Sequence, residues 1–127
     1  MKVICDTNIF ISLFENYQHT TEEIKSIGDE NVLMPVVAYM ELLAGMSDKK
    51  SMNKMMQKIK HYNVLHFDER VSVKASELMR DYKLSQSLQI PDAIIGAMAI
   101  VYNLSLHTYN KKDFRFMPGL KFYQVNQ

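Results

Sequence analysis

The sequence predicts an α/β protein of three layers, α/β/α, in which helices cover both faces of a short, mainly parallel central sheet. Two observations support this fold class. Short β-prone runs alternate along the chain with apolar segments of helical spacing, a pattern typical of parallel strands joined by helices. The chain has 127 residues, 47% of them hydrophobic and 23% charged, so residues 1–127 are expected to form one domain with its own core.

The first half of the chain is expected to form two strands and three helices. A β-prone run stops at an aspartate, and apolar residues at helical spacing follow it. Thr20 and Glu23 have the spacing of a capping box, Pro35 suits the first turn of a helix, and Gly45 suits its end. The expected elements are a strand at 2–5, a helix at 7–14, a polar helix from about 20 to 27, a strand at 31–34 and a helix at 35–44.

The second half is expected to form three helices and three strands. Asp48 and Asp68 are the predicted N-caps of two helices, and Pro91 opens a third that is apolar nearly all round and therefore central. The buried faces are expected to be Met52, Met55, Met56 and Ile59 on one helix, and Val71, Ala75, Leu78, Met79 and Tyr82 on the next. Strands are expected at 64–67, 104–108 and 122–125.

The composition argues against several classes of protein. One cysteine allows neither a disulfide framework nor a CxxC zinc site, and the four glycines form no phosphate-binding loop motif. The longest apolar run, residues 93–102, is too short to span a bilayer, and the charge at position 6 argues against a signal peptide. We therefore expect a cytoplasmic protein with no membrane segment.

Charge is distributed unevenly along the chain. Residues 1–41 contain two basic and seven acidic residues, whereas residues 42–127 contain thirteen basic and seven acidic ones. A basic face that binds a polyanion can therefore coexist with an acidic pocket. A scattered, solvated surface would give the same counts.

Four acidic residues occupy positions where a solvated carboxylate is not expected. Asp6 directly follows an apolar strand, and Glu41 lies among apolar residues of its helix. Asp92 is in the first turn of the most apolar helix, and Asp113 follows a strand. Unpaired buried carboxylates cost several kcal/mol each or become protonated. A divalent cation with a preference for oxygen ligands, Mg²⁺ or Mn²⁺, would resolve that conflict.

Each of the four also has a purely structural explanation. Asp6 fits a helix N-cap, and Asp92 is favoured near a helix N-terminus by the helix dipole. Glu41 could pair with a lysine, and Asp113 fits a turn. Taken one at a time, these residues leave the functional and the structural explanations open.

The segments that contain the four acids resemble the motifs of the PIN-domain family, and within it the VapC-type toxins of toxin–antitoxin modules. The segments are Cys-Asp-Thr-Asn at 5–8, Tyr-Met-Glu-Leu-Leu-Ala-Gly at 39–45, Ile-Pro-Asp-Ala-Ile-Ile-Gly-Ala at 90–97 and Thr-Tyr-Asn-Lys-Lys-Asp-Phe at 108–114. They follow the family's order and spacing over the whole length. The resemblance therefore implies a PIN-like fold for the entire chain.

The resemblance also implies an activity: metal-dependent hydrolysis of RNA phosphodiester bonds by an endoribonuclease that uses one or two Mg²⁺ or Mn²⁺ ions. It gives the catalytic and metal-binding roles to Asp6, Glu41, Asp92 and Asp113. Some members of the family carry an acid where this chain has Asn110, so Asn110 is the alternative to Asp113 as the fourth ligand. We favour Asp113, because only its side chain brings charge.

Neighbouring residues have supporting roles in this scheme. Thr7, Asn8 and Asn110 would hydrogen-bond a ligand carboxylate or the substrate phosphate. Lys111, Lys112 and Arg115 flank Asp113 and are the expected contacts of the RNA backbone. Contacts of this kind supply affinity and salt dependence rather than sequence readout.

Protein partners are implied as well. We expect a protein antitoxin and a homodimer. The apolar stripe of the first helix, Ile9, Phe10, Leu13 and Phe14 with Tyr17, is the candidate surface for either partner. Burial in the core of the monomer explains part of the same stripe equally well.

Two other functions are consistent with parts of the sequence. One is a non-catalytic PIN-fold module that binds RNA or a protein, and the retention of all four acids argues against it. The other is a phosphatase with Asp6 as its nucleophile. Such enzymes need a second acid two residues further on, where this chain has Asn8.

Overall fold

A parallel five-stranded sheet of order β3-β2-β1-β4-β5 forms the centre of the structure, a computed structural model that describes residues 1–125. The strands are β1 (Val3–Cys5), β2 (Val32–Pro35), β3 (Asn63–Leu65), β4 (Ser105–His107) and β5 (Lys121–Phe122). The helices are α1 (Thr7–Phe14), α2 (Gln18–Ile27), α3 (Val36–Ala44), α4 (Lys49–Ile59), α5 (Glu69–Gln86) and α6 (Ile90–Val101). Two 3₁₀ turns, η1 (Asp29–Asn31) and η2 (Lys111–Asp113), complete the described part.

The strand β1 is central and pairs in parallel with β2 and β4. Val3 is opposite Val32 on one side and Ser105 on the other, and Cys5 is opposite His107. The carboxyl ends of these strands therefore meet at one edge of the sheet. In open parallel sheets, this edge is where ligands bind.

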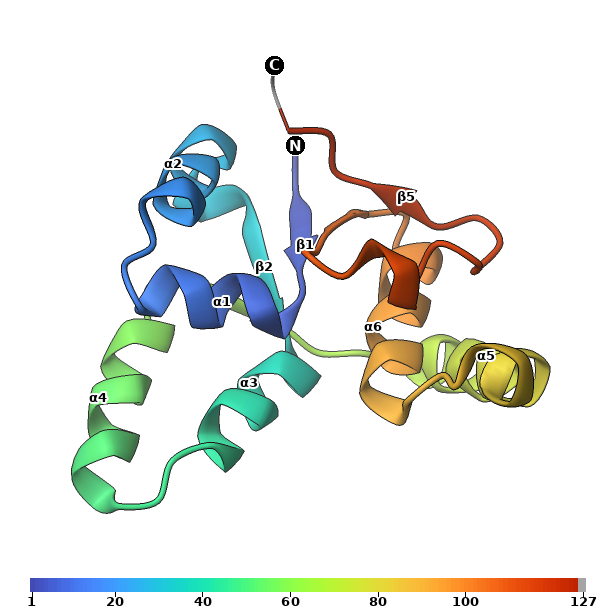
Figure 1. The fold of residues 1–127 in the computed structure, drawn as a ribbon, viewed down its shortest axis with the longest axis horizontal. Helices are drawn as coiled ribbons and strands as arrows, with labels where there is room; N and C mark the ends of the chain where they lie inside the picture. Colours follow the sequence, from blue (N-terminus) through green and yellow to red (C-terminus); the bar gives the residue numbers. More distant parts are fainter. Residues whose placement is uncertain (126–127) are drawn as a thin grey trace.

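The helices form a layer on each face of the sheet, as the sequence predicts (Figure 1). Because successive strand side chains point to opposite faces, Val3 and Cys5 pack on α1 and α2, whereas Ile4 packs on the side of α5 and α6. The helix α3 contributes to both clusters, through Val37 on one side and Ala38 on the other. The observed architecture is thus a three-layer α/β/α fold.

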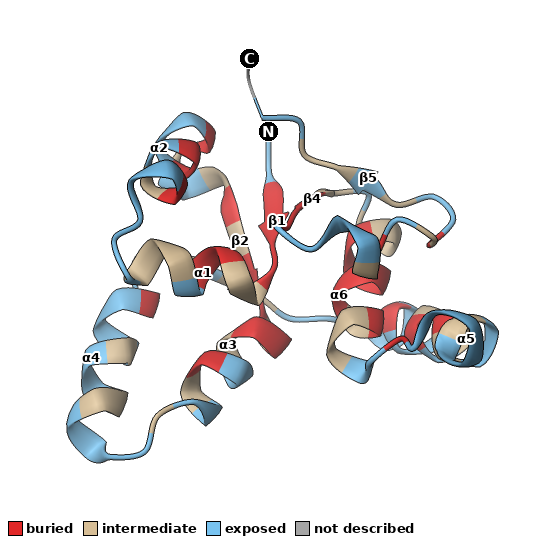
Figure 2. Ribbon diagram, in the orientation of Figure 1, coloured by how far each residue is buried: buried red, intermediate tan, exposed pale blue. Residues whose placement is uncertain are grey.

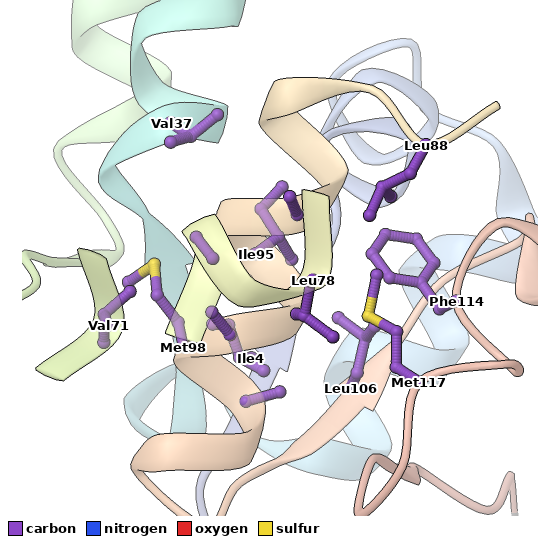
Figure 3. Packing of buried hydrophobic residues seen from close by; sticks show 14 residues of the cluster. Ile4, Val37, Val71, Leu78, Leu88, Ile95, Met98, Leu106, Phe114 and Met117 are labelled. Carbon is purple, nitrogen blue, oxygen red and sulfur yellow. The ribbon is translucent and has the colours of Figure 1, made fainter. Parts of the chain in front are cut away.

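The helix α6 is the most buried helix, as its composition predicts, and the strands beside it are buried as well (Figure 2). Figure 3 shows its packing with Leu78 of α5 and with Phe114 and Met117. Gly96 makes room for Met117, because a Cβ atom at this position would lie 2.3 Å from the methionine sulfur. Within residues 1–125, no helix combines the length and the apolar composition that crossing a bilayer requires.

The predicted capping box of Thr20 and Glu23 is wrong. The helix α2 begins at Gln18, and its N-cap is Tyr17, which makes no side-chain cap hydrogen bond. Thr20 and Glu23 are buried instead. Their spacing of three places both side chains on one helix face, and that face packs towards the end of β4, so the side chains bond to partners distant in sequence rather than to their own backbone.

The predicted buried face of α4 is only partly covered. The side chain of Asp48 accepts the N–H of Ser51 at 2.7 Å, which confirms the cap. Of the apolar stripe, however, only Ile59 is buried, Met52 and Met55 are half-buried, and Met56 is exposed. The helix lies beside α3 at the periphery of the structure, so one side of its stripe is left open (Figure 1).

The remaining differences are at the ends of elements. Pro35 was expected in the first turn of a helix but is the last residue of β2 and the N-cap of α3. The fifth strand was expected at 122–125 and is the two-residue pair Lys121–Phe122, which bonds only the outer edge of β4. The helix capped by Asp68 has Val71, Ala75 and Leu78 buried, as predicted.

Candidate functional site

Asp6 lies at the carboxyl end of the central strand, where it also caps α1. The N–H of Thr7 donates to its Oδ1 and the hydroxyl of Thr108 donates to its Oδ2, each at 2.8 Å. Burial raises the pKa of this carboxyl most strongly, the two hydrogen bonds lower it, and the charges of Glu41 and Asp113 raise it further. Asp6 is therefore both a cap and a member of a group of acids.

Asp92 is in the first turn of α6 and has the most perturbed carboxyl of the group. Burial, followed by the charges of Asp6, Asp113 and Glu41, raises its pKa to about 7. All four effects act in the same direction, and no hydrogen bond offsets them. The site therefore disfavours a negative charge on Asp92 unless a cation compensates for it.

Glu41 joins the group from α3 but is exposed, contrary to the prediction that it lies in an apolar environment. The physical reason is that α3 turns this position away from the sheet, while Val37, Ala38 and Leu42 face the core. The hydroxyl of Thr7 donates to Glu41 Oε1 at 2.6 Å. Thr7 thus bonds two of the acids at once, one through its backbone and one through its side chain.

Asp113 ends the η2 turn and lies beside a broad hollow of about 680 Å³. The hollow is lined by Gln86, Lys112, Asp113, Arg115 and Phe116. Two of the three predicted RNA contacts, Lys112 and Arg115, therefore lie next to an acid of the group. The third, Lys111, is placed elsewhere: its ammonium lies over the ring of Phe122, at 5.5 Å from the centroid.

The predicted supporting residues bond to the backbone around the acids. Asn8 Oδ1 accepts the N–H of Tyr109 at 3.4 Å. Asn110 is exposed, and its N–H donates to Thr108 Oγ1 at 3.0 Å. Asn110 thus takes part through its backbone, whereas Asp113 acts on the pKa of both Asp6 and Asp92.

The fold brings the four acids from four separate segments to one edge of the sheet. The charges of Glu41 and Asp113 raise the pKa of both Asp6 and Asp92, so the four carboxylates lie within electrostatic range. Among residues 1–125, however, no three side chains of His, Cys, Asp or Glu lie close enough together to bind one metal ion directly. In chemical type the donor set fits Mg²⁺ or Mn²⁺, because every donor is a carboxylate oxygen. Mg²⁺ in particular keeps several waters and needs only one or two direct carboxylates.

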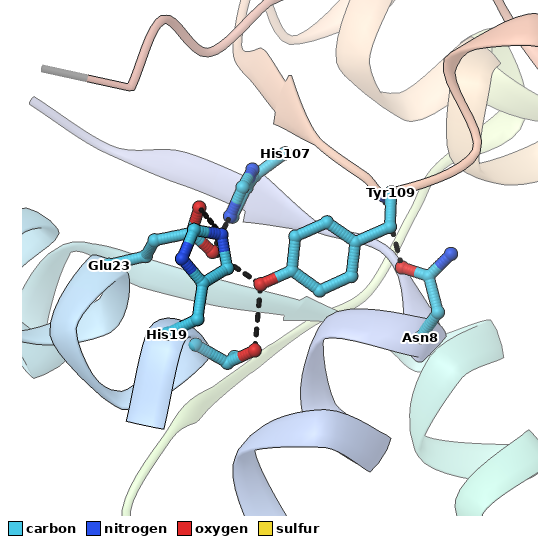
Figure 4. A network of polar contacts seen from close by, with 6 residues as sticks. Asn8, His19, Glu23, His107 and Tyr109 are labelled. Carbon is cyan, nitrogen blue, oxygen red and sulfur yellow. Dashed lines mark hydrogen bonds and ion pairs between the residues drawn. The ribbon is translucent and has the colours of Figure 1, made fainter. Parts of the chain in front are cut away.

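Sequence reasoning missed Thr108 and a polar network behind it. Glu23 of α2 accepts hydrogen bonds from the Tyr109 hydroxyl and from His107 Nε2, the latter at 3.1 Å (Figure 4). Thr20 bonds the same tyrosine oxygen at 2.7 Å. The only local signal was the spacing of Thr20 and Glu23, which matches a capping box equally well.

An apolar groove of about 290 Å³ runs between α1, α3 and α4. It is lined by Ile11, Phe14, Glu15, Glu41, Leu42, Gly45, Met46, Met55 and Lys58. Of the stripe predicted on the first helix, Ile9 and Phe10 belong to the core instead, and Tyr17 is exposed outside the groove. The groove reaches the acidic edge, because Glu41 forms part of its wall.

Comparison with known proteins places this geometry in a family. A VapC ribonuclease from Rickettsia bellii is 32% identical over 129 residues, which cover 95% of this chain and 94% of that protein. A toxin–antitoxin complex from Klebsiella pneumoniae contains a chain with a TM-score of 0.78 and 26% identity, covering 98% of this chain and all of that one. VapBC-1 from nontypeable Haemophilus influenzae gives a TM-score of 0.79 at 24% identity, with 98% of each chain covered, a likeness of fold.

The sequence signature of the family covers almost the whole molecule. The PIN domain model matches residues 3–119, from the first residue of β1 to the loop before β5. This range contains all four acids, Thr108 and the network behind it. On these grounds the chain belongs to the PIN-domain family.

Proposed function

We propose that this chain is a divalent-metal-dependent endoribonuclease, the toxin of a toxin–antitoxin pair, that hydrolyses RNA with Asp6, Glu41, Asp92 and Asp113. The observation that carries the proposal is the convergence of these four carboxylates, from four separate segments, at one edge of the sheet. Burial and the charges of Asp6, Asp113 and Glu41 raise the pKa of Asp92 to about 7. A cluster kept under such repulsion is the usual mark of a cation or catalytic site.

The protein supplies the oxygen ligands and fixes them. Asp6 is held at both carboxylate oxygens, so its free lone pairs have a defined direction. Thr7 ties Glu41 to the same loop. Asp113, rather than Asn110, completes the set, because its charge acts on both Asp6 and Asp92. The chemistry that Mg²⁺ or Mn²⁺ would supply here is activation of water at neutral pH and neutralisation of charge on the phosphate.

Binding of RNA requires positive charge beside the acids. Lys112 and Arg115 line the hollow at Asp113 and are exposed, so they are free to contact phosphates on either side of the bond that is cut. These contacts position the substrate without reading its sequence. The cytoplasm, where RNA is available, remains the predicted compartment.

The apolar groove between α1, α3 and α4 is the proposed site of the antitoxin. Its half-buried Phe14 and Met55 fit the apolar face of a partner helix. Glu41 lies in its wall, so a bound segment would also obstruct the acidic edge. Two of the similar solved structures are toxin–antitoxin or VapBC assemblies, which supports a protein partner. A homodimer is also proposed, and sedimentation of the partner-free chain tests it.

The nuclease proposal is tested by a matched cleavage assay. The wild type and an Asp92→Asn variant, purified in parallel without any partner, are incubated with total RNA in Mg²⁺, Mn²⁺ or EDTA. We expect internal cuts that need the metal and disappear in the variant, with 5′-phosphate and 3′-hydroxyl ends. Cutting that persists in the variant would point to a contaminating ribonuclease.

Two outcomes would replace the proposal. RNA that is retarded on a gel but never cut, under any metal, would make the chain a binding module. Release of inorganic phosphate from a monoester, with RNA chains left intact, would make it a phosphatase. For the antitoxin, Phe14→Asp should abolish both binding of a protein antitoxin and inhibition by it, while leaving RNA cleavage by the free chain unchanged.

A further inference from the structure

We infer that Glu23, His107 and Tyr109 form a positioning network that holds the catalytic carboxylate of Asp6 through Thr108. The inference rests on the proposed function, which it deepens. The network lies on the α2 side of the sheet, behind the acidic edge, and none of its three side chains is an acid of the cluster (Figure 4).

Glu23 is a buried carboxylate that is fully provided with donors. Its side chain is 6% exposed. It accepts the hydroxyl of Tyr109 and His107 Nε2, the latter at 3.1 Å, and His19 Nε2 lies 3.2 Å from its other oxygen as an ion-pair partner. A carboxylate can only accept, so the hydrogen bond from His107 places a proton on Nε2 of that ring. The single proton of the Tyr109 hydroxyl goes to Glu23, so the Thr20 hydroxyl must donate to the tyrosine oxygen.

The donors come from the segment that leaves β4 towards the acids. His107 and Tyr109 are two residues apart and bond the same carboxylate, whereas Thr108 between them bonds Asp6 on the opposite side. This alternation is that of an extended chain. One face of the segment is therefore fixed to α2, and the other face holds the candidate catalytic acid.

The same segment holds the whole loop around Asp6. The carbonyl of His107 accepts the N–H of Asp6 at 2.9 Å, and the N–H of Tyr109 donates to Asn8 at 3.4 Å. With the Thr108 hydroxyl, three consecutive residues bond Asp6 and Asn8. Movement of the segment would carry Asp6 with it, and displacement of a catalytic group by about 1 Å can cost about 10²-fold in rate.

The hydroxyl of Tyr109 keeps its proton, and aromatic rings pack around His107. Burial, followed by the hydrogen bond to Glu23, raises the pKa of Tyr109 to about 12, so its proton stays in place. Burial lowers the pKa of His107, the hydrogen bond and charge of Glu23 raise it, and the charges of Lys111 and His19 lower it further. The rings of Tyr109 and Tyr123 pack edge-on against His107 at 5.5 and 5.3 Å.

The test removes one hydroxyl and compares it with a matched control. Tyr109→Phe keeps the ring and loses the donor to Glu23. Tyr123→Phe also loses a hydroxyl beside His107, but one that makes no hydrogen bond to the network. We expect Tyr109→Phe to lower the kcat of RNA cleavage about tenfold with little change in KM, and Tyr123→Phe to leave both constants unchanged.

A double-mutant cycle separates positioning from a general loss of stability. Thr108→Val removes the hydrogen bond between the segment and the Asp6 carboxylate and leaves the backbone bond from Asp6 to His107 in place. If the network acts through Thr108, Tyr109→Phe has little further effect on kcat in the Thr108→Val background. Equal fold-losses in both backgrounds, or an unchanged kcat in Tyr109→Phe, would overturn the inference.

Amide hydrogen exchange gives a readout that does not depend on activity. The N–H groups of Asp6 and Thr7 are expected to exchange several-fold faster in Tyr109→Phe than in Tyr123→Phe, measured in EDTA. Unaltered exchange would overturn the inference even if the wild type is a nuclease. A wild type that cuts no RNA would instead overturn the proposed function, and the exchange comparison would still judge the network.

Discussion

The carboxylates of Glu23, which is buried, and of Asp92, which is half-buried, differ in their surroundings. Glu23 receives hydrogen bonds from Tyr109 and His107, and His19 lies beside it as an ion-pair partner. Asp92 has three other carboxylates within electrostatic range, and every effect on it raises its pKa. A buried polar group with all its partners contributes to the fold, whereas a group kept under repulsion lowers stability and is retained for another purpose. The two carboxylates thus distinguish a positioning network from a reactive edge.

The largest expected effect comes from an isosteric change at the reactive edge. Asp6→Asn keeps an oxygen that can accept the N–H of Thr7, places an amide NH₂ against the hydroxyl oxygen of Thr108, which can accept from it, and removes a negative charge. We predict a loss of RNA cleavage of about 10³-fold or more, since metal and phosphate stabilisation supply several kcal/mol. Unfolding in urea should show stability within about 0.5 kcal/mol of the wild type. A variant that unfolds would show that Asp6 acts only as a cap.

The opposite pattern is expected on the network side. Glu23→Ala leaves the buried donor of His107 and the part-buried hydroxyl of Tyr109 without their acceptor, which costs about 2–3 kcal/mol in the free energy of unfolding. Glu22→Ala is the matched control, because Glu22 is exposed on the same helix and accepts only Gln18, at 2.9 Å. Denaturant titration of both variants checks the prediction. A stability loss below about 0.5 kcal/mol in Glu23→Ala would mean that the donors find water instead.

The fold and the reactive edge were predictable because their signals are local. Strand–helix alternation predicts a parallel layered sheet, and each acid lies within a short motif that follows a strand or belongs to a helix. The network was not predictable, because Glu23 and His107 are 84 residues apart and no local pattern pairs them. The capping-box spacing of Thr20 and Glu23 then favoured the wrong explanation. Exposure of Glu41 was missed for a related reason: an apolar sequence neighbourhood does not say which way one helix position faces.

A smaller effect should appear in the pH dependence of stability without metal. The pKa of Asp92 in the folded protein, about 7, lies above its ordinary value of 3.8. Between about pH 4 and pH 7 the folded chain therefore binds more protons at this site than the unfolded chain. This extra proton binding adds to the free energy of unfolding. Its contribution is fully present below about pH 4 and is lost as the pH rises towards 7.

The Asp92→Asn variant isolates this contribution. Burial lowers the pKa of His107, and this shift changes stability with pH in the opposite direction over part of the same pH range. The informative quantity is therefore the difference in the free energy of unfolding between the wild type and the variant. In EDTA, the free energy of unfolding of Asp92→Asn should rise by about 1–2 kcal/mol relative to the wild type between pH 4 and pH 7. This value is reduced because solvent screens the half-exposed carboxyl. A constant difference across this range would contradict the raised pKa.

The smallest expected effect concerns the basic residues beside the acids. Lys112→Gln and Arg115→Gln should each raise the KM for RNA about three- to tenfold at low salt, with kcat nearly unchanged, because phosphate contacts position the substrate without taking part in bond cleavage. Each change should also reduce the slope of log affinity against log salt by about one. Lys54→Gln, an exposed lysine on α4 away from the hollow, serves as the control. Equal changes in KM at all three positions would mean that RNA binding depends on net charge alone. The hollow beside Asp113 would then have no special part in binding RNA near the acids.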